Sequence, residues 1–225
     1  MIIMILLLSI LGGIILLDKQ AIGEFGVSQP IVACSLIGFI FGEFSTGFIL
    51  GSALQLIWTG ALPLGSKEPL DNQGAGIVAI SLFILATTMP INVTYEKMFF
   101  TSLLFGGVAS LIGQSLSQAQ KKLNNKLFTH VGKNSTDKLI ITTHFTGLIT
   151  AFLRGFVLIL FFLVLFILIS PLIKLLPDFS VGELLILPLI IGIASIARLV
   201  ILRKRILYAT LGVMTGLLLW VLLKL

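Results

Sequence analysis

The chain has 225 residues, of which 57% are hydrophobic and 11% are charged, and its mean hydropathy is +1.16. A soluble fold cannot bury that much apolar surface, so the composition excludes a soluble domain and indicates an integral membrane protein. The net charge of +6 raises nucleic-acid binding as an alternative. The positive charges flank apolar segments, however, and no aromatic residues interleave with them to stack on bases, so we expect a lipid bilayer and no nucleic acid as the surroundings.

Apolar runs follow one another along the chain and are separated by short polar segments. They cover roughly residues 1–17, 27–64, 74–93, 98–116, 139–173, 181–202 and 206–223. About 20 residues of helix cross a hydrocarbon core of about 30 Å, so each run predicts at least one span. The runs 27–64 and 139–173 are too long for one upright helix and are expected to tilt, break or re-enter the bilayer. No hydrophilic stretch is long enough for a separate domain, which predicts a single membrane-embedded domain over residues 1–225.

The first apolar run is interpreted as a retained membrane segment, because it has no basic region before it and Asp18 and Lys19 follow it directly. Residues 117–138 contain five lysines and one aspartate, and a second basic cluster contains Arg198, Arg203, Lys204 and Arg205. Under the positive-inside rule both clusters face the cytoplasm, and the loop with Asp178 faces the other side.

Glycine and proline punctuate the run 27–64, which predicts discontinuous helices of the kind that transporters contain. Gly38 and Gly42 are four residues apart, and we expect both to allow close packing between helices. Glu43 interrupts the same run. Two interpretations of Glu43 remain open, a loop between half-helices and a polar cavity.

The segment 65–76 is a polar island between two apolar runs, and polar groups at membrane depth usually mark a site. Asp71, Asn72 and Gln73 offer hydrogen-bond donors and acceptors at neighbouring positions, which is what sugar hydroxyls require. An ordinary solvated loop is the alternative. The sequence contains no phosphate-binding loop, no metal-ligand set and no catalytic constellation, and the single cysteine, Cys34, excludes an intrachain disulfide.

Arg154 lies well inside the run 139–173. A central arginine in a membrane helix costs about 2.5–3.5 kcal/mol, so its side chain is expected to face a cavity or an acidic partner. Such a pair would also serve simply to hold helices together. His144 lies in the same run, close to the basic segment, where an interfacial position competes with a proton-relay role.

Residues 17–65 resemble the amino-terminal half of the IIC subunit of the mannose/fructose/sorbose family of permeases in the phosphoenolpyruvate-dependent phosphotransferase system. The matching elements are Asp18, the Ser28–Gln29–Pro30 turn, the Gly42–Glu43 pair, Thr46, Gly47 and Pro63–Leu64–Gly65. The resemblance continues more weakly to Asp71, His144 and Arg154. The chain departs from the family pattern at Lys67, Glu68 and Leu70.

The resemblance implies an all-α, polytopic helical bundle with broken helices and re-entrant hairpins in a bacterial cytoplasmic membrane. It implies a sugar permease that is not itself an enzyme, needs no cofactor, and pairs with a IID subunit in a larger oligomer of IIC–IID heterodimers. The sugar would be phosphorylated by a IIB protein that receives its phosphoryl group from IIA. Expected sugar-binding residues are Asp71, Asn72, Gln73 and Glu68, and expected cavity or structural residues are Glu43, His144, Arg154 and Gln29.

Two other classes of function stay open at this point. One is a small-molecule permease without phosphotransfer coupling. The other is a membrane-embedded lipid-modifying enzyme, which would need a set of His, Ser or Asp side chains presented to a headgroup. His130 lies in the basic segment and His144 has no acid near it in the sequence, so no such set is apparent.

Overall fold

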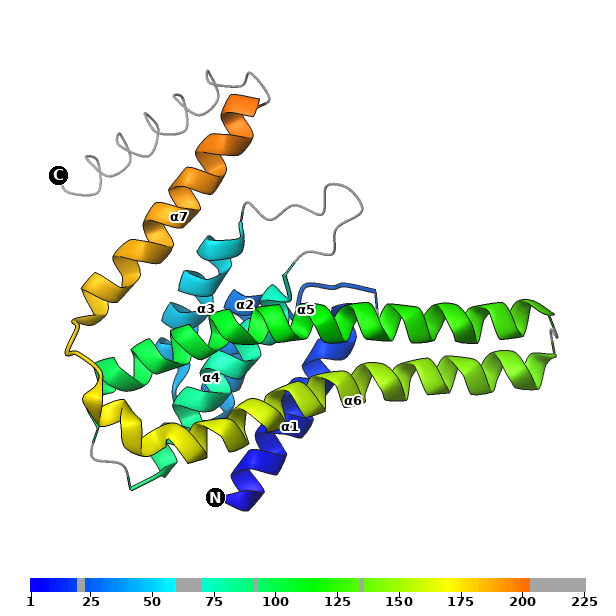
Figure 1. Cartoon of the computed structure of the whole chain (residues 1–225), viewed down its shortest axis with the longest axis horizontal. Helices are drawn as coiled ribbons and strands as arrows, with labels where there is room; N and C mark the ends of the chain where they lie inside the picture. Colours follow the sequence, from blue (N-terminus) through cyan, green and yellow to red (C-terminus); the bar gives the residue numbers. More distant parts are fainter. Residues whose placement is uncertain (20–22, 60–69, 91–92, 134–135, 203–225) are drawn as a thin grey trace.

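The computed structural model describes residues 1–19, 23–59, 70–90, 93–133 and 136–202, with side chains described except at 130–133 and 198–202. The described residues form α-helices and one 3₁₀ turn, without strands (Figure 1). The all-α fold predicted from the sequence is therefore confirmed. In chain order the elements are α1 (Ile2–Leu17), α2 (Pro30–Ile40), α3 (Phe44–Trp58), α4 (Asn72–Thr88), α5 (Tyr95–Lys133), α6 (Asp137–Ile169), η2 (Ser170–Leu175) and α7 (Val181–Leu202).

The run 27–64 does break, and it forms a hairpin of two short helices. With 11 and 15 residues, α2 and α3 are only about 17 and 23 Å long, too short to cross a hydrocarbon core of about 30 Å. Gly42 makes the turn between them with a φ of +80°, which L-residues with a side chain rarely adopt. A Cβ on Gly42 would touch nothing within 4 Å, so the expectation that Gly42 is a packing glycine is wrong.

Three other glycines bring the two helices of this hairpin into backbone contact. A Cβ on Gly38 would lie 2.6 Å from the carbonyl oxygen of Glu43, and one on Gly51 would lie 2.5 Å from that of Pro30. A Cβ on Gly47 would collide with the carbonyl oxygen of Cys34. Small residues at these positions let the helices approach closely, which is how helices without a hydrophobic driving force associate in membranes.

Helix α4 is the centre of the molecule. Residues 73–86 are all buried, and the helix packs against α2, α3, α5 and α6, with a smaller contact to α1. A helix that is apolar on every side has no solvent face and belongs inside a bundle. The polar residues at its start are therefore carried into the interior of the protein.

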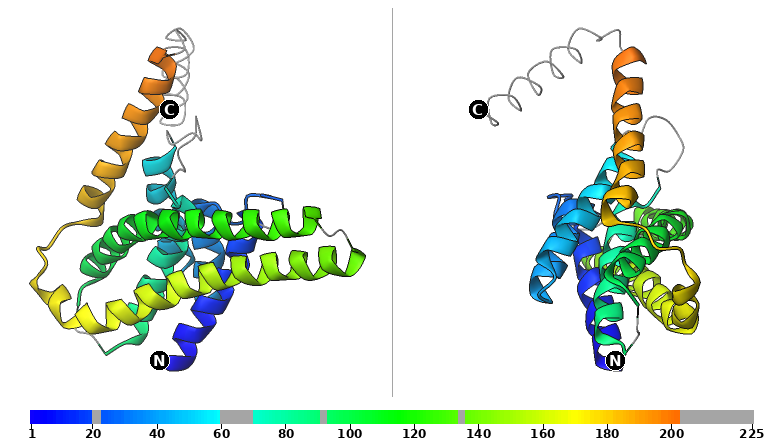
Figure 2. Two further views of the ribbon diagram at one scale, coloured as in Figure 1. Left: turned by 45° about the vertical axis from the view of Figure 1, so that its right-hand side comes forward. Right: turned by 90° about the vertical axis from the view of Figure 1, so that its left-hand side faces the viewer.

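Helices α5 and α6 form a long antiparallel hairpin, seen from three directions in Figures 1 and 2. Among the described residues, Tyr95–Thr129 and Asp137–Leu175 are long and apolar enough to cross a membrane, and the other apolar helices are shorter. The apolar run expected at 98–116 ends before the lysine-rich segment, but the helix continues through residues 117–133, so that α5 is 39 residues long. Lys, Gln, Leu and Ala in this segment favour helix, and no proline interrupts it.

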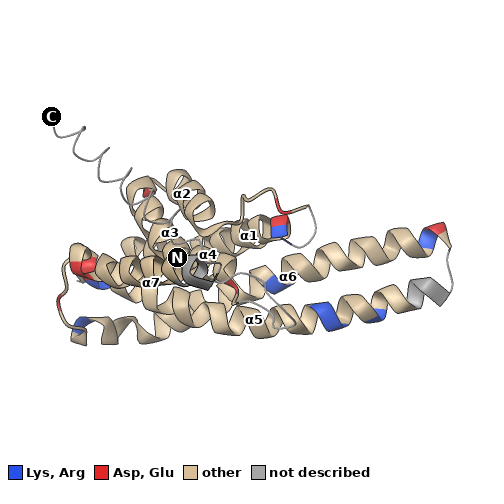
Figure 3. Ribbon diagram, turned by 90° about the horizontal axis from the view of Figure 1, so that it is seen from above, with Lys and Arg blue, Asp and Glu red and all other residues tan. Residues whose placement is uncertain are grey.

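The run 139–173 was expected to tilt, break or re-enter the bilayer. In the structure it does not break before Ser170, because α6 is continuous over 33 residues and η2 begins only there. Near its far end, Lys97 forms an ion pair with Asp178 with 3.1 Å between Nζ and Oδ1. Figure 3 shows this charged end of the hairpin opposite the end that carries the lysines of α5. The structure thus places Asp178 and the lysines of α5 at opposite ends of the hairpin.

We expect Gly47→Ala to loosen the α2–α3 hairpin, because its new Cβ would meet the backbone of Cys34 rather than a flexible side chain. Overpacking of this kind costs about 1–3 kcal/mol. The melting temperature in detergent should fall, and a membrane-permeant maleimide should react faster with Cys34, which is fully buried in the native protein.

Gly107→Ala is the matched control, because a Cβ on that helical glycine would touch nothing within 4 Å. It should leave both the melting temperature and the labelling rate of Cys34 unchanged or slightly improve stability. Equal behaviour of the two variants would contradict backbone contact within the hairpin.

Candidate functional site

Asp71 immediately precedes α4 and is buried. The two oxygens of its carboxylate have different hydrogen-bond partners. Its Oδ1 accepts a hydrogen bond of 3.1 Å from the backbone N–H of Gly74 and so caps the helix. Its Oδ2 accepts a hydrogen bond of 2.9 Å from Nη2 of Arg154 on α6. Asp71 is 2% exposed and Arg154 is 7% exposed. The acid that faces the intramembrane arginine is therefore the aspartate of the polar island.

Helix α5 completes the surroundings of this ion pair. Nη1 of Arg154 donates to the hydroxyl oxygen of Ser117, and the backbone N–H of Asp71 donates to the carbonyl oxygen of Ser110 at 3.1 Å. A Cβ on Gly113 would lie 2.6 Å from Oδ2 of Asp71, so glycine is required there for α5 to pass the carboxylate. The ion pair thus joins the start of α4 to the middle of both long helices.

The two residues after Asp71 carry amide side chains. Gln73 is 1% exposed, and its Oε1 has no hydrogen-bond partner. Asn72 is half-buried at the first position of the helix. A buried acceptor without a partner costs about 1–3 kcal/mol, so it calls for a donor from a ligand or from water.

Two more amides come from the α2–α3 hairpin. Gln29 precedes α2, and its Oε1 accepts a hydrogen bond of 3.4 Å from Nε2 of Gln55 on α3. Oε1 of Gln55 is buried without a partner. A Cβ on Gly76 would lie 3.0 Å from Pro30, so the first turns of α4 lie against the start of α2. We call Gln29, Gln55, Asn72 and Gln73 the amide cluster.

Asp18 holds the loop that leads into Gln29. Its Oδ1 accepts a hydrogen bond from the N–H of Phe25 at 2.8 Å, and its Oδ2 accepts bonds from Gly26 and from both N–H and hydroxyl of Ser28 at 3.0–3.1 Å. Burial alone would raise the pKa of the Asp18 carboxyl, but these hydrogen bonds hold the pKa below its ordinary value. The charged aspartate therefore fixes the approach to α2.

The remaining expected site residues lie elsewhere. Glu43 begins α3 at the hairpin turn, where its Oε2 accepts a 3.0 Å hydrogen bond from Thr46, whose hydroxyl is also 3.1 Å from that of Tyr95. Of its two interpretations, the structure favours the turn between half-helices. His144 is exposed on α6, ten residues and so about 15 Å along the helix from Arg154. Glu68 falls outside the described residues.

Sequence reasoning missed Gln55, Ser117 and the clamp made by Asp18. Gln55 had a signal, because it is a polar residue inside the apolar stretch ALQLIW. Nothing in the sequence singled out Ser117, because serine is common in helices and usually has no special role there. Among the described residues no group of His, Cys, Asp and Glu is arranged to hold a metal ion. The amide cluster offers neutral donors and acceptors, which suit a neutral, hydroxyl-rich molecule.

The fold and this site define a helical membrane protein in which short, paired half-helices bring polar groups into the interior, a construction known from transporters. The family model described as "PTS system sorbose-specific iic component" matches residues 2–223. The chain therefore belongs to this family of phosphotransferase-system IIC components, as its sequence motifs predict.

Individual relatives cover smaller parts of the chain. The sorbose-specific EIIC component of Lacticaseibacillus casei is 29% identical over 142 residues, which are 60% of this chain and 47% of that protein. The sorbose-specific EIIC component of Klebsiella pneumoniae is 35% identical over 66 residues, 29% of this chain and 25% of the relative. The mannose-specific EIIC component of Escherichia coli K12 is 34% identical over 61 residues, 27% of this chain and 23% of the relative. The chain thus matches less than half the length of these relatives.

A solved structure described as "Structure of membrane protein" aligns with this chain, and the alignment covers 100% of this chain and 96% of the chain in that structure. Its TM-score is 0.68 and its sequence identity is 18%. At that identity the match establishes the fold.

Replacing Arg154 by Leu should strongly destabilise the protein, because the buried Asp71 carboxylate would lose its counter-charge. Breaking one side of a buried pair costs about 3–5 kcal/mol. The double variant Asp71→Asn and Arg154→Gln removes both charges and keeps an oxygen that caps α4. It should be more stable than Arg154→Leu alone, as measured by thermal unfolding in detergent. A double variant that is less stable than the single one would contradict a coupled pair.

Proposed function

We propose that this chain is the membrane permease subunit, IIC, of a mannose-family phosphoenolpyruvate-dependent sugar phosphotransferase system. It acts as one multi-pass domain in a bacterial cytoplasmic membrane. Membership of the IIC family supports the class of function. The observation that carries the proposal is the unpartnered Oε1 of Gln73, which is buried at the start of the central helix. A second buried oxygen without a partner, Oε1 of Gln55, lies on the α2–α3 hairpin that packs against this helix.

Sugar hydroxyls supply the donors that these two oxygens lack. Each hydroxyl can donate to Oε1 of Gln55 or Gln73 and accept from an amide N–H of the same cluster. Gln29, at the same end of the α2–α3 hairpin as Gln55, and Asn72, at the start of α4, provide the further hydrogen bonds. A sugar is neutral, so amides bind it without the desolvation penalty that a buried charge would add.

The role of Asp71 differs from the role that its position in the polar island suggests. Its two oxygens already accept hydrogen bonds from Gly74 and Arg154, so we assign it to positioning rather than to direct sugar contact. It fixes the first turn of α4, which carries Asn72 and Gln73. Arg154 is its counter-charge, and Asp18 has the corresponding positioning role for Gln29.

Phosphoryl transfer belongs to other proteins in this proposal. A IIB protein phosphorylates the sugar on the cytoplasmic side and is itself recharged by IIA, while a IID subunit completes the membrane complex in an oligomer of IIC–IID heterodimers. The test is phosphoenolpyruvate-dependent phosphorylation of a panel of sugars by membranes that contain this chain with its partner subunits. Chain-dependent phosphorylation of a sugar is the expected result. Uptake of a sugar without phosphorylation would favour an uncoupled permease.

Gln73→Leu should weaken sugar binding, because leucine has a similar size and removes the orphaned acceptor. Loss of one neutral hydrogen bond is worth about 0.5–1.5 kcal/mol, so the half-saturating sugar concentration should rise about two- to twelvefold. Uptake of radiolabelled sugar into vesicles measures this change.

Ser81→Ala is the matched control on the same helix. Ser81 is also fully buried with an unpartnered oxygen, yet it lies two turns further along α4, away from the amide cluster. It should transport sugar with unchanged affinity. Equal loss in both variants would mean that a general defect of α4, and not the amide of Gln73, explains the result.

A further inference from the structure

Helices α5 and α6 form a groove of about 310 Å³ between them. Its walls are apolar, with Leu123 on α5 and with Leu153 and Val157 on α6. These three side chains are 41–50% exposed. The groove is therefore open at the surface of the hairpin, where the surroundings of the protein reach it.

Two buried polar side chains interrupt this apolar lining. Gln120 and Arg154 both line the groove, and each is 7% exposed. Among the described residues, Oε1 of Gln120 is a buried acceptor without a hydrogen-bond partner and Nε of Arg154 is a buried donor without one. The other two guanidinium nitrogens of Arg154 already donate to Ser117 and Asp71. Leaving buried polar atoms unpaired is costly, so this pair calls for a ligand.

The two unpaired atoms specify the chemistry of the occupant. Nε–H of Arg154 needs an acceptor, and Oε1 of Gln120 needs a donor. Hydroxyl groups supply both functions, whereas ester carbonyl oxygens and phosphate oxygens only accept. Asp71 already matches the charge of Arg154, so the occupant needs no negative charge at this point. The groove thus favours a molecule that joins hydroxyl groups to an apolar chain.

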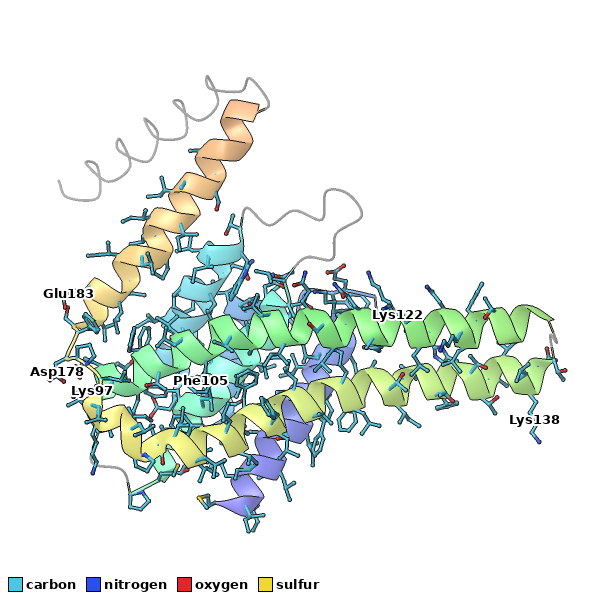
Figure 4. The ribbon with its side chains drawn as sticks, viewed as in Figure 1. Lys97, Phe105, Lys122, Lys138, Asp178 and Glu183 are labelled. Carbon is cyan, nitrogen blue, oxygen red and sulfur yellow. The ribbon has the colours of Figure 1, made fainter. Side chains whose placement is uncertain are left out.

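The level of the groove along the hairpin favours a membrane lipid over a free sugar. Residues 98–120 of α5 carry no charged side chain, and neither do residues 155–173, which follow on α6 and η2. Figure 4 labels Lys97 and Lys122 on either side of the uncharged stretch of α5. That stretch is about 35 Å long, enough to cross a hydrocarbon core of about 30 Å. Both unpaired atoms therefore lie where an uncharged stretch ends, at the level of lipid glycerol and headgroups.

We propose that this groove binds a membrane lipid whose headgroup carries free hydroxyl groups, for which phosphatidylglycerol is the probe. The hydroxyls accept from Nε of Arg154 and donate to Oε1 of Gln120, while an acyl chain lies along Leu116 and Val157, towards the hydrocarbon core. The bound lipid completes the hydrogen bonding of the guanidinium that holds Asp71. The groove is separate from the amide cluster, so the proposal does not depend on sugar transport.

The test titrates lipid into the full chain in lauryldimethylamine oxide, a detergent without hydroxyl groups, and counts bound lipid by native mass spectrometry. Phosphatidylmethanol is the matched lipid, because it has the charge and the acyl chains of phosphatidylglycerol but no hydroxyl. Phosphatidylglycerol should reach half-saturation at a concentration about two- to twelvefold lower, as expected for one neutral hydrogen bond. Equal binding of the two lipids would overturn the proposal.

Gln120→Leu removes the unpaired acceptor and keeps a side chain of similar size. It should bring the half-saturating concentrations of the two lipids together. Its melting temperature without added lipid should stay the same or rise, because the variant no longer buries an unpaired oxygen. Gln118→Leu is the matched control, since Gln118 is exposed on the same helix and is not among the described residues that line the groove. A lipid preference that is lost in both variants, or kept in both, would contradict a role of Gln120.

Ala119→Phe tests the location of the lipid. Ala119 is exposed and lines the groove, so a phenyl ring there fills the open space without entering the packed core. The half-saturating concentration of phosphatidylglycerol should rise severalfold, with an unchanged melting temperature in detergent alone. Unchanged binding would place the lipid elsewhere on the chain. Absence of bound lipid from the unmodified chain would mean that water or another protein fills the groove, and either result would overturn the proposal.

Discussion

The buried ion pair between Asp71 and Arg154 is the interaction on which the interior of this protein depends. Two charges at this depth are costly unless each is paired and hydrogen-bonded, and here the carboxylate also caps α4 while the guanidinium also donates to Ser117. The pair connects residues 83 positions apart. It therefore sets where the central helix begins relative to the two long helices, and packing of α4 follows from that point.

The amide cluster depends on this arrangement for its geometry. Asn72 and Gln73 occupy the turn that Asp71 caps, and Gly76 packs that turn against Pro30, beside Gln29. The sulfur of Cys34 also lies 3.1 Å from the carbonyl oxygen of Gly76, across the same contact. The hairpin and α4 thus meet through close backbone contacts that cannot shift gradually, so the cluster is preorganised rather than assembled around a ligand.

Local chemistry made part of this structure predictable. The glycines and prolines of the run 27–64 predicted a break in it, and the acid and amides of the polar island marked the start of α4, because such residues are conspicuous in apolar runs. The position of the break was not predicted, since Gly42 was assigned to helix packing and Glu43 had two interpretations. The partner of Arg154 was not predictable, since its pairing with Asp71 is set by tertiary packing over a long separation. The helical continuation of α5 was missed because a basic, polar segment fits a cytoplasmic loop as well as an extended helix. Gln55 was missed because a single polar residue in an apolar helix has several ordinary explanations.

The neutrality of the amide cluster has a consequence for the proposed transport cycle. Its four side chains carry no charge, and the carboxylate beside them is already matched by Arg154. Such a site binds hydroxyls well, but a phosphate monoester carries a charge that these amides cannot neutralise, so its desolvation would go uncompensated. Phosphorylation would therefore convert a ligand that fits the cluster into one that does not. That difference in affinity favours release of the product and opposes its return, without any change in the fold of the permease.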